Sequence, residues 1–330
     1  MAEIARPLVA VVGGDSLLAR ELRELLSESK PSPRVELISA AADNSTVLAQ
    51  EEDETVVMIP LSAESLEGAS VAFLAGSAAS SRRSLKLNPQ GGPMLIDLTG
   101  ALEDQPSARL RAPSAEAARP ETSSIQVIAH PAAIALAKIL ATLAPLATIR
   151  RTIIHIFEPA SERGQRGLDE LQQQTVAALS FQKMKTDVYD AQVGFNLLAR
   201  YGEEAMEPLD SVEQRLERHL ASLLSGYPSV PMPSLRLIQA PVFHGHSFSV
   251  WIEFDENPGL DAISRALSGA GIDVRPDEPP TNVGIAGQSG LAVGAIATDH
   301  NQPRACWLWM VADNLRLAAE NAIAVAQEAL

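Results

Sequence analysis

The chain has 330 residues, of which 46% are hydrophobic and 20% are charged, and its formal net charge is −15. This length fits about two domains, and the composition can supply each with a buried core. Because phosphate groups repel an acidic surface, we expect neither a nucleic-acid partner nor a membrane partner. No apolar stretch approaches the ~20 residues that span a bilayer. The single cysteine, Cys306, can form no internal disulfide, which is typical of a cytoplasmic protein.

The first part of the chain shows the pattern of an α/β domain. An apolar run at 8–12 precedes Gly13 and Gly14, and an amphipathic stretch follows at 17–28, which predicts a strand, a tight turn and a helix. The segment 102–124 is rich in Pro, Ala, Ser and Glu and is predicted to be a loop. Strands separated by helical or polar segments are typical of a parallel sheet in a Rossmann-type, dinucleotide-binding domain. Further strands are predicted at 35–40, 54–60, 70–76, 93–100 and 125–131.

The rest of the chain predicts an α+β domain with a mixed or antiparallel sheet. Apolar and polar residues alternate in 247–254, which indicates a strand with one covered face. Ser211 and Asp313 are the predicted N-caps of two helices, over 211–224 and 313–330. Other helices are predicted at 132–144 and 166–180, and other strands at 149–157, 235–243, 291–297 and 305–312. We therefore expect a dinucleotide-binding domain at 1–131 and a second domain at 132–312, with the closing helix packed back on the first.

Four strings occur in the order found in a known family. They are HPAAIALAKILATLAPL (130–146), GLDELQQQT (167–175), APVFHGHS (240–247) and ADNLR (312–316). With them, essentially the whole chain resembles the aspartate-semialdehyde dehydrogenase family. The resemblance implies an NAD(P)-binding domain, a substrate and dimerisation domain, a homodimer, and a role in amino-acid biosynthesis. The implied reaction is the phosphorylating oxidation of an aldehyde through a cysteine thioester.

The resemblance also implies where the nucleophile should be. The family's Asn-Pro-Asn-Cys-Ser-Thr segment falls on residues 130–135, so that Ala133 occupies the cysteine position. A methyl group can form neither a thiohemiacetal nor a thioester. Cys306 lies in an apolar run and is predicted to be buried and inert. His246 matches the family's general acid/base. Its neighbour His244 makes a His-Gly-His tripeptide, but two histidines without a third ligand predict no metal site.

The groups that would hold an anionic substrate are also altered. The family's cationic clamps fall on Gln239, Leu102 and Glu213, none of which carries a positive charge. Glu158 stands where the family usually has glutamine. Because cations have been lost and carboxylates gained, an anionic substrate is disfavoured.

The glycine-rich turn after the first strand is changed in a similar way. The candidate cofactor-binding residues here are Gly13, Gly14, Asp15, Ser16, Leu17 and Leu18. Ser16 narrows the backbone approach to a pyrophosphate, and Asp15 adds a negative charge beside it. The segment 41–44 offers no arginine for a 2′-phosphate, so NAD is favoured over NADP if either binds. By analogy with the family, Ser77 and Asn314 would hold the nicotinamide end.

Three hypotheses follow. The first is a catalytically impaired family member that acts as a binding or scaffold protein, as a homodimer or as the partner of an active paralogue. The second is an NAD-dependent oxidoreductase in which His246 is the acid/base and no thioester forms. The third is an active semialdehyde dehydrogenase, which would require a cysteine other than Cys306. The small-molecule ligand is not identified by the sequence.

Overall fold

The computed structural model describes residues 6–41, 47–51, 54–119, 121 and 123–329. The chain divides into two compact units. The first comprises residues 1–113, 119–129 and 318–330, and the second comprises 114–118 and 130–317.

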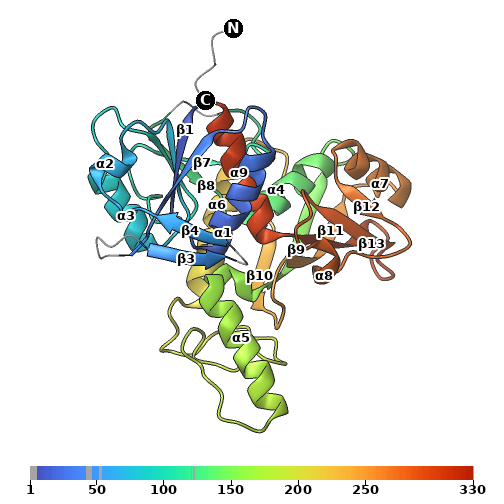
Figure 1. Cartoon of the computed structure of the whole chain (residues 1–330). Coiled ribbons are helices and arrows are strands. Elements are labelled where there is room, and N and C mark those ends of the chain that lie inside the picture. The colour runs from blue at the N-terminus through green and yellow to red at the C-terminus, as the bar shows by residue number, and fades with distance from the viewer. Residues whose placement is uncertain (1–5, 42–46, 52–53, 120, 122, 330) are drawn as a thin grey trace. The chain divides into compact units, whose positions relative to one another are not determined.

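The first unit contains a six-stranded sheet in the order β2-β1-β5-β6-β8-β7, and every neighbouring pair is parallel (Figure 1). This confirms the Rossmann-type sheet. A separate antiparallel pair, β3-β4, lies outside it. The strands are β1 (Leu8–Val12), β2 (Arg34–Ile38), β3 (Val47–Glu51), β4 (Glu54–Met58), β5 (Val71–Leu74), β6 (Met94–Asp97), β7 (Ala108–Arg111) and β8 (Ile125–Ile128). The helices are α1 (Leu17–Glu28), α2 (Ala63–Leu66) and α3 (Ala78–Leu87).

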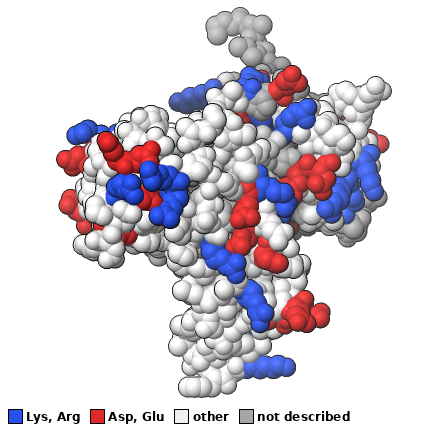
Figure 2. All heavy atoms as spheres, turned by 180° about the vertical axis from the view of Figure 1, so that it is seen from behind, with Lys and Arg blue, Asp and Glu red and all other residues white. Residues whose placement is uncertain are grey.

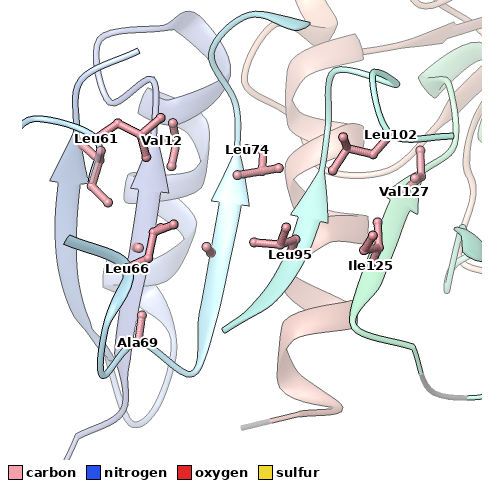
Figure 3. Packing of buried hydrophobic residues seen from close by; sticks show 12 residues of the cluster. Val12, Leu61, Leu66, Ala69, Leu74, Leu95, Leu102, Ile125 and Val127 are labelled. Atoms are coloured by element: carbon pink, nitrogen blue, oxygen red, sulfur yellow. The ribbon is translucent and has the colours of Figure 1, made fainter. Parts of the chain in front are cut away.

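Apolar side chains from the strands and from the segments that follow them form the core of this unit (Figure 3). Val12, Leu74 and Leu95 are fully buried on β1, β5 and β6. Strands of a parallel sheet are covered on both faces, which explains why their sequences read as continuous apolar runs. Leu102, which stands at a predicted anion-clamp position, is fully buried in this same core.

The strand β7 corrects one prediction. Residues 102–124 were expected to be a loop, but Ala108–Arg111 pairs in parallel with β8 at the edge of the sheet. The sequence of β7, ARLR, has too few apolar residues to be recognised as a strand. Arg111 donates to both carboxylate oxygens of Glu328 at 2.9 and 3.0 Å, and this pair ties the C-terminal residues to the edge strand within the first unit.

The second unit contains a six-stranded sheet in the order β10-β9-β11-β14-β13-β12. The outer pairs β10-β9 and β13-β12 are parallel and the inner pairs are antiparallel, so the sheet is mixed, as predicted. The strands are β9 (Ile149–Glu158), β10 (Ser234–Gln239), β11 (His246–Phe254), β12 (Asp273–Arg275), β13 (Ala292–Thr298) and β14 (Ala305–Ala312). The helices are α4 (Pro131–Leu143), α5 (Gly164–Leu179), α6 (Leu209–Leu224), α7 (Leu260–Gly269) and α8 (Asn282–Ile285), with a 3-10 turn, η1, at Ala160–Arg163. Helix α9 (Asn314–Gln327) begins in the second unit, and its residues from 318 belong to the first.

Two predicted helix starts have different outcomes. The Asp313 side chain accepts from the N–H groups of Leu315 and Arg316, which confirms it as the N-cap of α9. The prediction of Ser211 as the cap of α6 is wrong, because the helix begins at Leu209 and Pro208 occupies the N-cap position. Pro208 has no side-chain acceptor for the N–H groups of the first turn, so α6 begins without a side-chain cap.

The two faces of the mixed sheet differ in exposure. Residues of one face are almost fully buried, among them Ile154 on β9, Val250 on β11 and Leu308 on β14. On the other face, Ile153 and Trp307 are 42% and 37% exposed. They belong to one row across the sheet, since Trp251 pairs with Ile153 on one side and with Trp307 on the other. The prediction of one covered face does not hold for β11 itself, which is buried on both sides except at Ser249. The partly open face is formed by its neighbours β9 and β14.

Helix α5 forms hydrogen bonds with residues 185–194 of the long segment that follows it (Figure 1). The carboxylate of Glu170 accepts from the N–H groups of Val188 and Tyr189. The amide of Gln174 donates to two carbonyls of the same segment and accepts from the N–H groups of Val193 and Gly194. These hydrogen bonds order a stretch that has no regular secondary structure of its own.

Among the described helices, none combines the length and apolarity needed to cross a membrane. On the face shown in Figure 2, acidic and basic side chains are interspersed among the residues drawn in colour.

Candidate active site

Three titratable side chains from distant parts of the sequence meet in the second unit. His130 is the N-cap of α4, Glu162 lies in η1, and His246 is the first residue of β11. The Nε2 atom of His130 lies 3.7 Å from one oxygen of Glu162, and the Nδ1 atom of His246 lies 3.9 Å from the other. The two imidazole ring centroids are 5.5 Å apart. We refer to His130, Glu162 and His246 as the histidine–glutamate cluster.

The orientation of His130 follows from its place at the helix start. The Nδ1 atom of its ring accepts a hydrogen bond from the backbone N–H of Ala132 at 3.2 Å. The backbone N–H of His130 donates to Nδ1 of His219 at 2.9 Å. Because Nδ1 is an acceptor, the proton of the neutral ring is on Nε2, which faces the cluster. Burial and the neighbouring His246 lower the pKa of His130 well below its usual value.

His246 is 1% exposed, and neither of its ring nitrogens has a hydrogen-bond partner among the described residues. Burial lowers the pKa of His246 to about 4, so the ring is neutral at pH 7 and can accept a proton. His244 is outside the cluster, although the two histidines are separated by only one glycine. His244 precedes β11, and Gly245, at φ +81°, turns the backbone between the two histidines.

The amide of Asn314 fixes the third member of the cluster. Its nitrogen donates to Glu162 at 2.9 Å, and its oxygen accepts from the hydroxyl of Ser161 and the N–H of Gly245, each at 3.1 Å. Burial raises the pKa of the Glu162 carboxyl. Asn314 was predicted to hold a nicotinamide. In this structure both ends of its amide are engaged within the second unit, and the cofactor role stays a prediction.

A chain of ion pairs, buried at its Glu158–Arg163 end, lies next to the cluster. Arg163 lies 2.9 Å from a carboxylate oxygen of Glu158 and 3.4 Å from one of Glu207, which in turn lies 3.3 Å from Arg215. The side chains of Glu158 and Arg163 are 0% and 8% exposed, and the guanidinium also lies over the ring of Tyr201. The positive charge of Arg163 is thus neutralised by two carboxylates of the chain itself.

The predicted clamp positions are occupied by groups with structural partners. The amide nitrogen of Gln239 donates to the carbonyls of Glu158 and Ala240, and its oxygen accepts from the Tyr201 hydroxyl at 2.5 Å. Glu213 accepts from the N–H of Leu237 at 2.6 Å and so joins α6 to β10. Leu102, at the third clamp position, is buried in the core of the first unit. The side chains of Gln239, Glu213 and Leu102 therefore provide no positive charge for an anionic substrate.

The single cysteine lies far from the histidine–glutamate cluster, and the nucleophile position is a buried alanine. Ala133 lies in the first turn of α4, three residues after His130, and is fully buried. Cys306 is fully buried on β14, opposite Ile252 on β11, while His246 of β11 is opposite Ala312. Along β14, Cys306 therefore lies six residues before Ala312, the residue that pairs with His246. At ~3.4 Å per residue of an extended strand, this separation is about 20 Å.

The candidate cofactor-binding residues gather in the first unit at the turn between β1 and α1. Gly13 and Gly14 are buried and donate to the carbonyl of Ile38, whereas Asp15 is exposed. The Ser16 hydroxyl caps α1 by accepting from the N–H of Ala19. The N–H groups of Leu17 and Leu18 are in the first helical turn, where they have no intrahelical partner and attract anions. The structure thus retains a helix N-terminus at this turn.

Two further observations concern the same end of the sheet. Ser77 forms a capping box with Ser80 at the start of α3, so its hydroxyl is engaged. Arg83 of α3 donates to the carbonyls of Ala40 and Ala41 at 2.6 and 2.8 Å, and this brings a guanidinium to the end of β2. Residues 42–46, which include the predicted acidic position at Asp43, lie outside the described residues.

Sequence reasoning missed three of the residues that surround His246. His130 was placed only within the segment of the nucleophile, and Glu162 and Arg163 were not singled out. The available signal was the string SERG two residues after the strand that ends at Glu158, because loops that follow strands often carry functional side chains.

The two units define a class of two-domain α/β proteins, with a Rossmann-type sheet followed by a mixed-sheet domain whose β11 begins at a buried histidine. The family model for the semialdehyde dehydrogenase dimerisation domain matches residues 140–317, more than half of the chain. The chain therefore belongs to the semialdehyde dehydrogenase family.

Individual relatives agree with this assignment. The USG-1 protein homolog of Pseudomonas aeruginosa is 32% identical, with 97% of each chain covered. The aspartate-semialdehyde dehydrogenase of Rickettsia bellii is 27% identical over 97% of this chain and 96% of its own. Among solved structures, a probable aspartate-semialdehyde dehydrogenase from Pseudomonas aeruginosa has a TM-score of 0.84 and 28% identity, with 98% of each chain covered. The Candida albicans aspartate semialdehyde dehydrogenase with NADP shares the fold, with a TM-score of 0.70 at 15% identity and 98% and 99% coverage.

Proposed function

We propose that this chain is a non-acylating member of the semialdehyde dehydrogenase family that acts as a binding or scaffold protein. The observation that carries the proposal is the position of its only thiol. Cys306 lies about 20 Å along the strand from the row of His246. A general base activates a nucleophile only within hydrogen-bond reach of it. The proposed acid/base and the thiol are therefore too far apart to form a thioester in one site.

The surroundings of His246 support the same proposal. An anionic substrate needs fixed cations, and Arg163 is held by Glu158 and Glu207 within the protein. Gln239 satisfies its hydrogen bonds with the backbone and Tyr201. The proposal that the chain is a pseudoenzyme thus rests on the missing thiol and also on the missing free cations, and both disfavour the family's reaction.

The direct test is an assay of purified protein with aspartate semialdehyde, phosphate and NADP, beside an active relative. We expect no turnover above the background without enzyme. Robust turnover that survives in Cys306→Ser would point to chemistry without a thiol, and turnover lost in Cys306→Ser would overturn the proposal.

Restoring the thiol should not restore the reaction. In Ala133→Cys, we expect activity to stay at least about 10³-fold below that of an active relative, because the cationic groups that bind and orient an anionic substrate are missing. The measurement is kcat/KM for aspartate semialdehyde, with Ala135→Cys in the same buried turn as the matched control. Recovery to within about tenfold of the relative would show that the altered clamps do not matter.

Cys306 itself should be unreactive in the folded protein. Burial raises the pKa of its thiol to about 12, so the thiolate is scarce at pH 8. We expect a thiol reagent at pH 8 to label native protein at least about 100-fold more slowly than protein unfolded in guanidinium chloride. Equal rates in the two states would place the thiol at the surface.

A second candidate function is nucleotide-dependent oxidoreduction without a thioester. The parallel sheet and the N-terminus of α1 favour it, and His246, neutral at pH 7, would be the acid/base. Arg83 at the end of β2 favours NADP, since a guanidinium matches a 2′-phosphate, whereas the sequence favoured NAD. Titration with NADH and NADPH, followed by nicotinamide fluorescence, tests this. Saturable micromolar binding supports it, and no binding at millimolar cofactor contradicts it.

We also propose that the chain forms a cytoplasmic homodimer, or pairs with an active paralogue, through the open face of the mixed sheet. Ile153 and Trp307 expose apolar surface there, as an interface requires. In Ile153→Glu, we expect the dimer's Kd to rise by at least about 100-fold, because an interface centre does not tolerate an unpaired charge. Light scattering after size-exclusion chromatography measures this. Val57→Glu, at an exposed apolar residue of the first unit, is the matched control and should leave the mass unchanged.

A further inference from the structure

The histidine–glutamate cluster has the composition and spacing of a metal site. Its three donor atoms all lie within 4.8 Å of one another, although the residues come from α4, η1 and β11. Two donor atoms on one tetrahedral zinc ion, each bound at ~2.0–2.1 Å, lie about 3.3 Å apart. The two nitrogen–oxygen separations, 3.7 and 3.9 Å, exceed that value by only a few tenths of an ångström.

Three of the four ring nitrogens of the two histidines lack other partners among the described residues. Nε2 of His130 and both nitrogens of His246 are buried and form no hydrogen bond within the part of the chain that the structure describes. The two residues are 6% and 1% exposed. Leaving one buried polar atom unpaired costs about 1–3 kcal/mol. A cation bound by Nε2 of His130 and Nδ1 of His246 would remove this cost for those two atoms, whereas nothing in the described protein around them does so.

The carboxylate of the cluster is already held in place. Asn314 donates to one oxygen of Glu162, and its own oxygen is fixed by Ser161 and Gly245. Such partners behind the ligands set the orientation of metal-binding groups. The nearby Arg163 does not oppose a cation with a free positive charge, because Glu158 and Glu207 neutralise it.

We propose that His130, His246 and Glu162 bind one divalent transition-metal ion, of which zinc is the best match, with a coordination position left open. Two imidazoles and one carboxylate suit zinc and its first-row neighbours rather than calcium or magnesium, which prefer oxygen ligands. The prediction of no metal considered only His244 and His246, whereas the second and third ligands come from other elements.

The hydrogen bond at His130 gives the proposal a specific signature. Nδ1 accepts from the N–H of Ala132, so the neutral ring carries its proton on Nε2. Coordination through Nε2 displaces that proton, and a ring protonated on Nδ1 can no longer accept from Ala132. Metal binding through His130 therefore breaks this hydrogen bond, and the amide resonance of Ala132 should shift when zinc is added.

The experiment uses the full chain, freed of metal with a chelator. Cobalt(II) and zinc are the probes, with visible absorption of cobalt for the coordination geometry and calorimetry for stoichiometry and Kd. We expect one ion per chain and a tetrahedral or five-coordinate cobalt spectrum. Glu162→Gln, which keeps the bond from Asn314, and His246→Ala should each raise Kd on the order of 100-fold. His244→Ala is the matched control and should leave Kd unchanged.

Each alternative result has a defined meaning. No ion bound at millimolar zinc would overturn the proposal, and so would binding that is equally strong in Glu162→Gln and His246→Ala. Loss of binding in His244→Ala alone would place the metal at the His-Gly-His turn and contradict the assigned ligands. The readouts need no turnover and no nucleotide, so failure of the metal site is distinguishable from failure of the proposed function.

Discussion

Replacing Arg163 by alanine should destabilise the second unit by about 3–5 kcal/mol, because it leaves the buried carboxylate of Glu158 without its counter-ion. Burial raises the pKa of Glu158, whereas the positive charge of Arg163 lowers it, so the charged form of Glu158 depends on Arg163. The three tryptophans, Trp251, Trp307 and Trp309, all lie in the second unit. Their fluorescence during urea unfolding therefore reports this loss directly.

Two variants make the prediction for Arg163 specific. Arg236→Ala removes an exposed ion pair to Glu213, with Arg236 58% exposed, and should cost less than about 1 kcal/mol. Adding Glu158→Gln to Arg163→Ala removes the unpaired charge and should recover most of the loss, since an amide is less costly to bury than a carboxylate. If the double variant is no more stable than Arg163→Ala, the loss comes from packing and not from charge.

Replacing Gly13 by alanine should destabilise the first unit by more than about 4 kcal/mol, among the largest effects of single substitutions. Gly13 has φ +85°, and a Cβ there would lie 2.3 Å from the Cα of Gly76. The obstacle is backbone, so the β1–α1 and β5–α3 turns must move apart. In Gly13→Ala, the unfolding followed by far-UV circular dichroism should therefore begin at a lower urea concentration than the unfolding followed by tryptophan fluorescence. The reason is that the tryptophans are all in the other unit.

Gly91→Ala is the matched control for Gly13. Its φ is +77°, but an added Cβ meets nothing within 4 Å, so it carries only the conformational cost of about 1–2 kcal/mol. The difference between the two variants isolates the contact between the turns. Equal losses would mean that the close approach of Gly13 to Gly76 does not constrain the fold. Any nucleotide binding should be lost in Gly13→Ala and kept in Gly91→Ala, because only the former displaces the N-terminus of α1.

The sequence by itself determined the order of most strands and helices, the parallel and mixed sheets and the family. These depend on local patterns, since a buried strand such as β1 is a run of apolar residues and a cap such as Asp313 acts on its own helix. It missed β7, because a short edge strand needs little apolar surface and is defined by its pairing with β8.

Only the tertiary structure decided what surrounds His246. His130, Glu162 and Arg163 are 83 to 116 positions away from His246 in the chain. They meet it because the start of α4, the turn η1 and the start of β11 lie at one place. Likewise, strand pairing is what separates Cys306 from His246. Local propensity acts over a few residues, whereas the chemistry of a site depends on which distant side chains burial and strand pairing bring within a few ångströms.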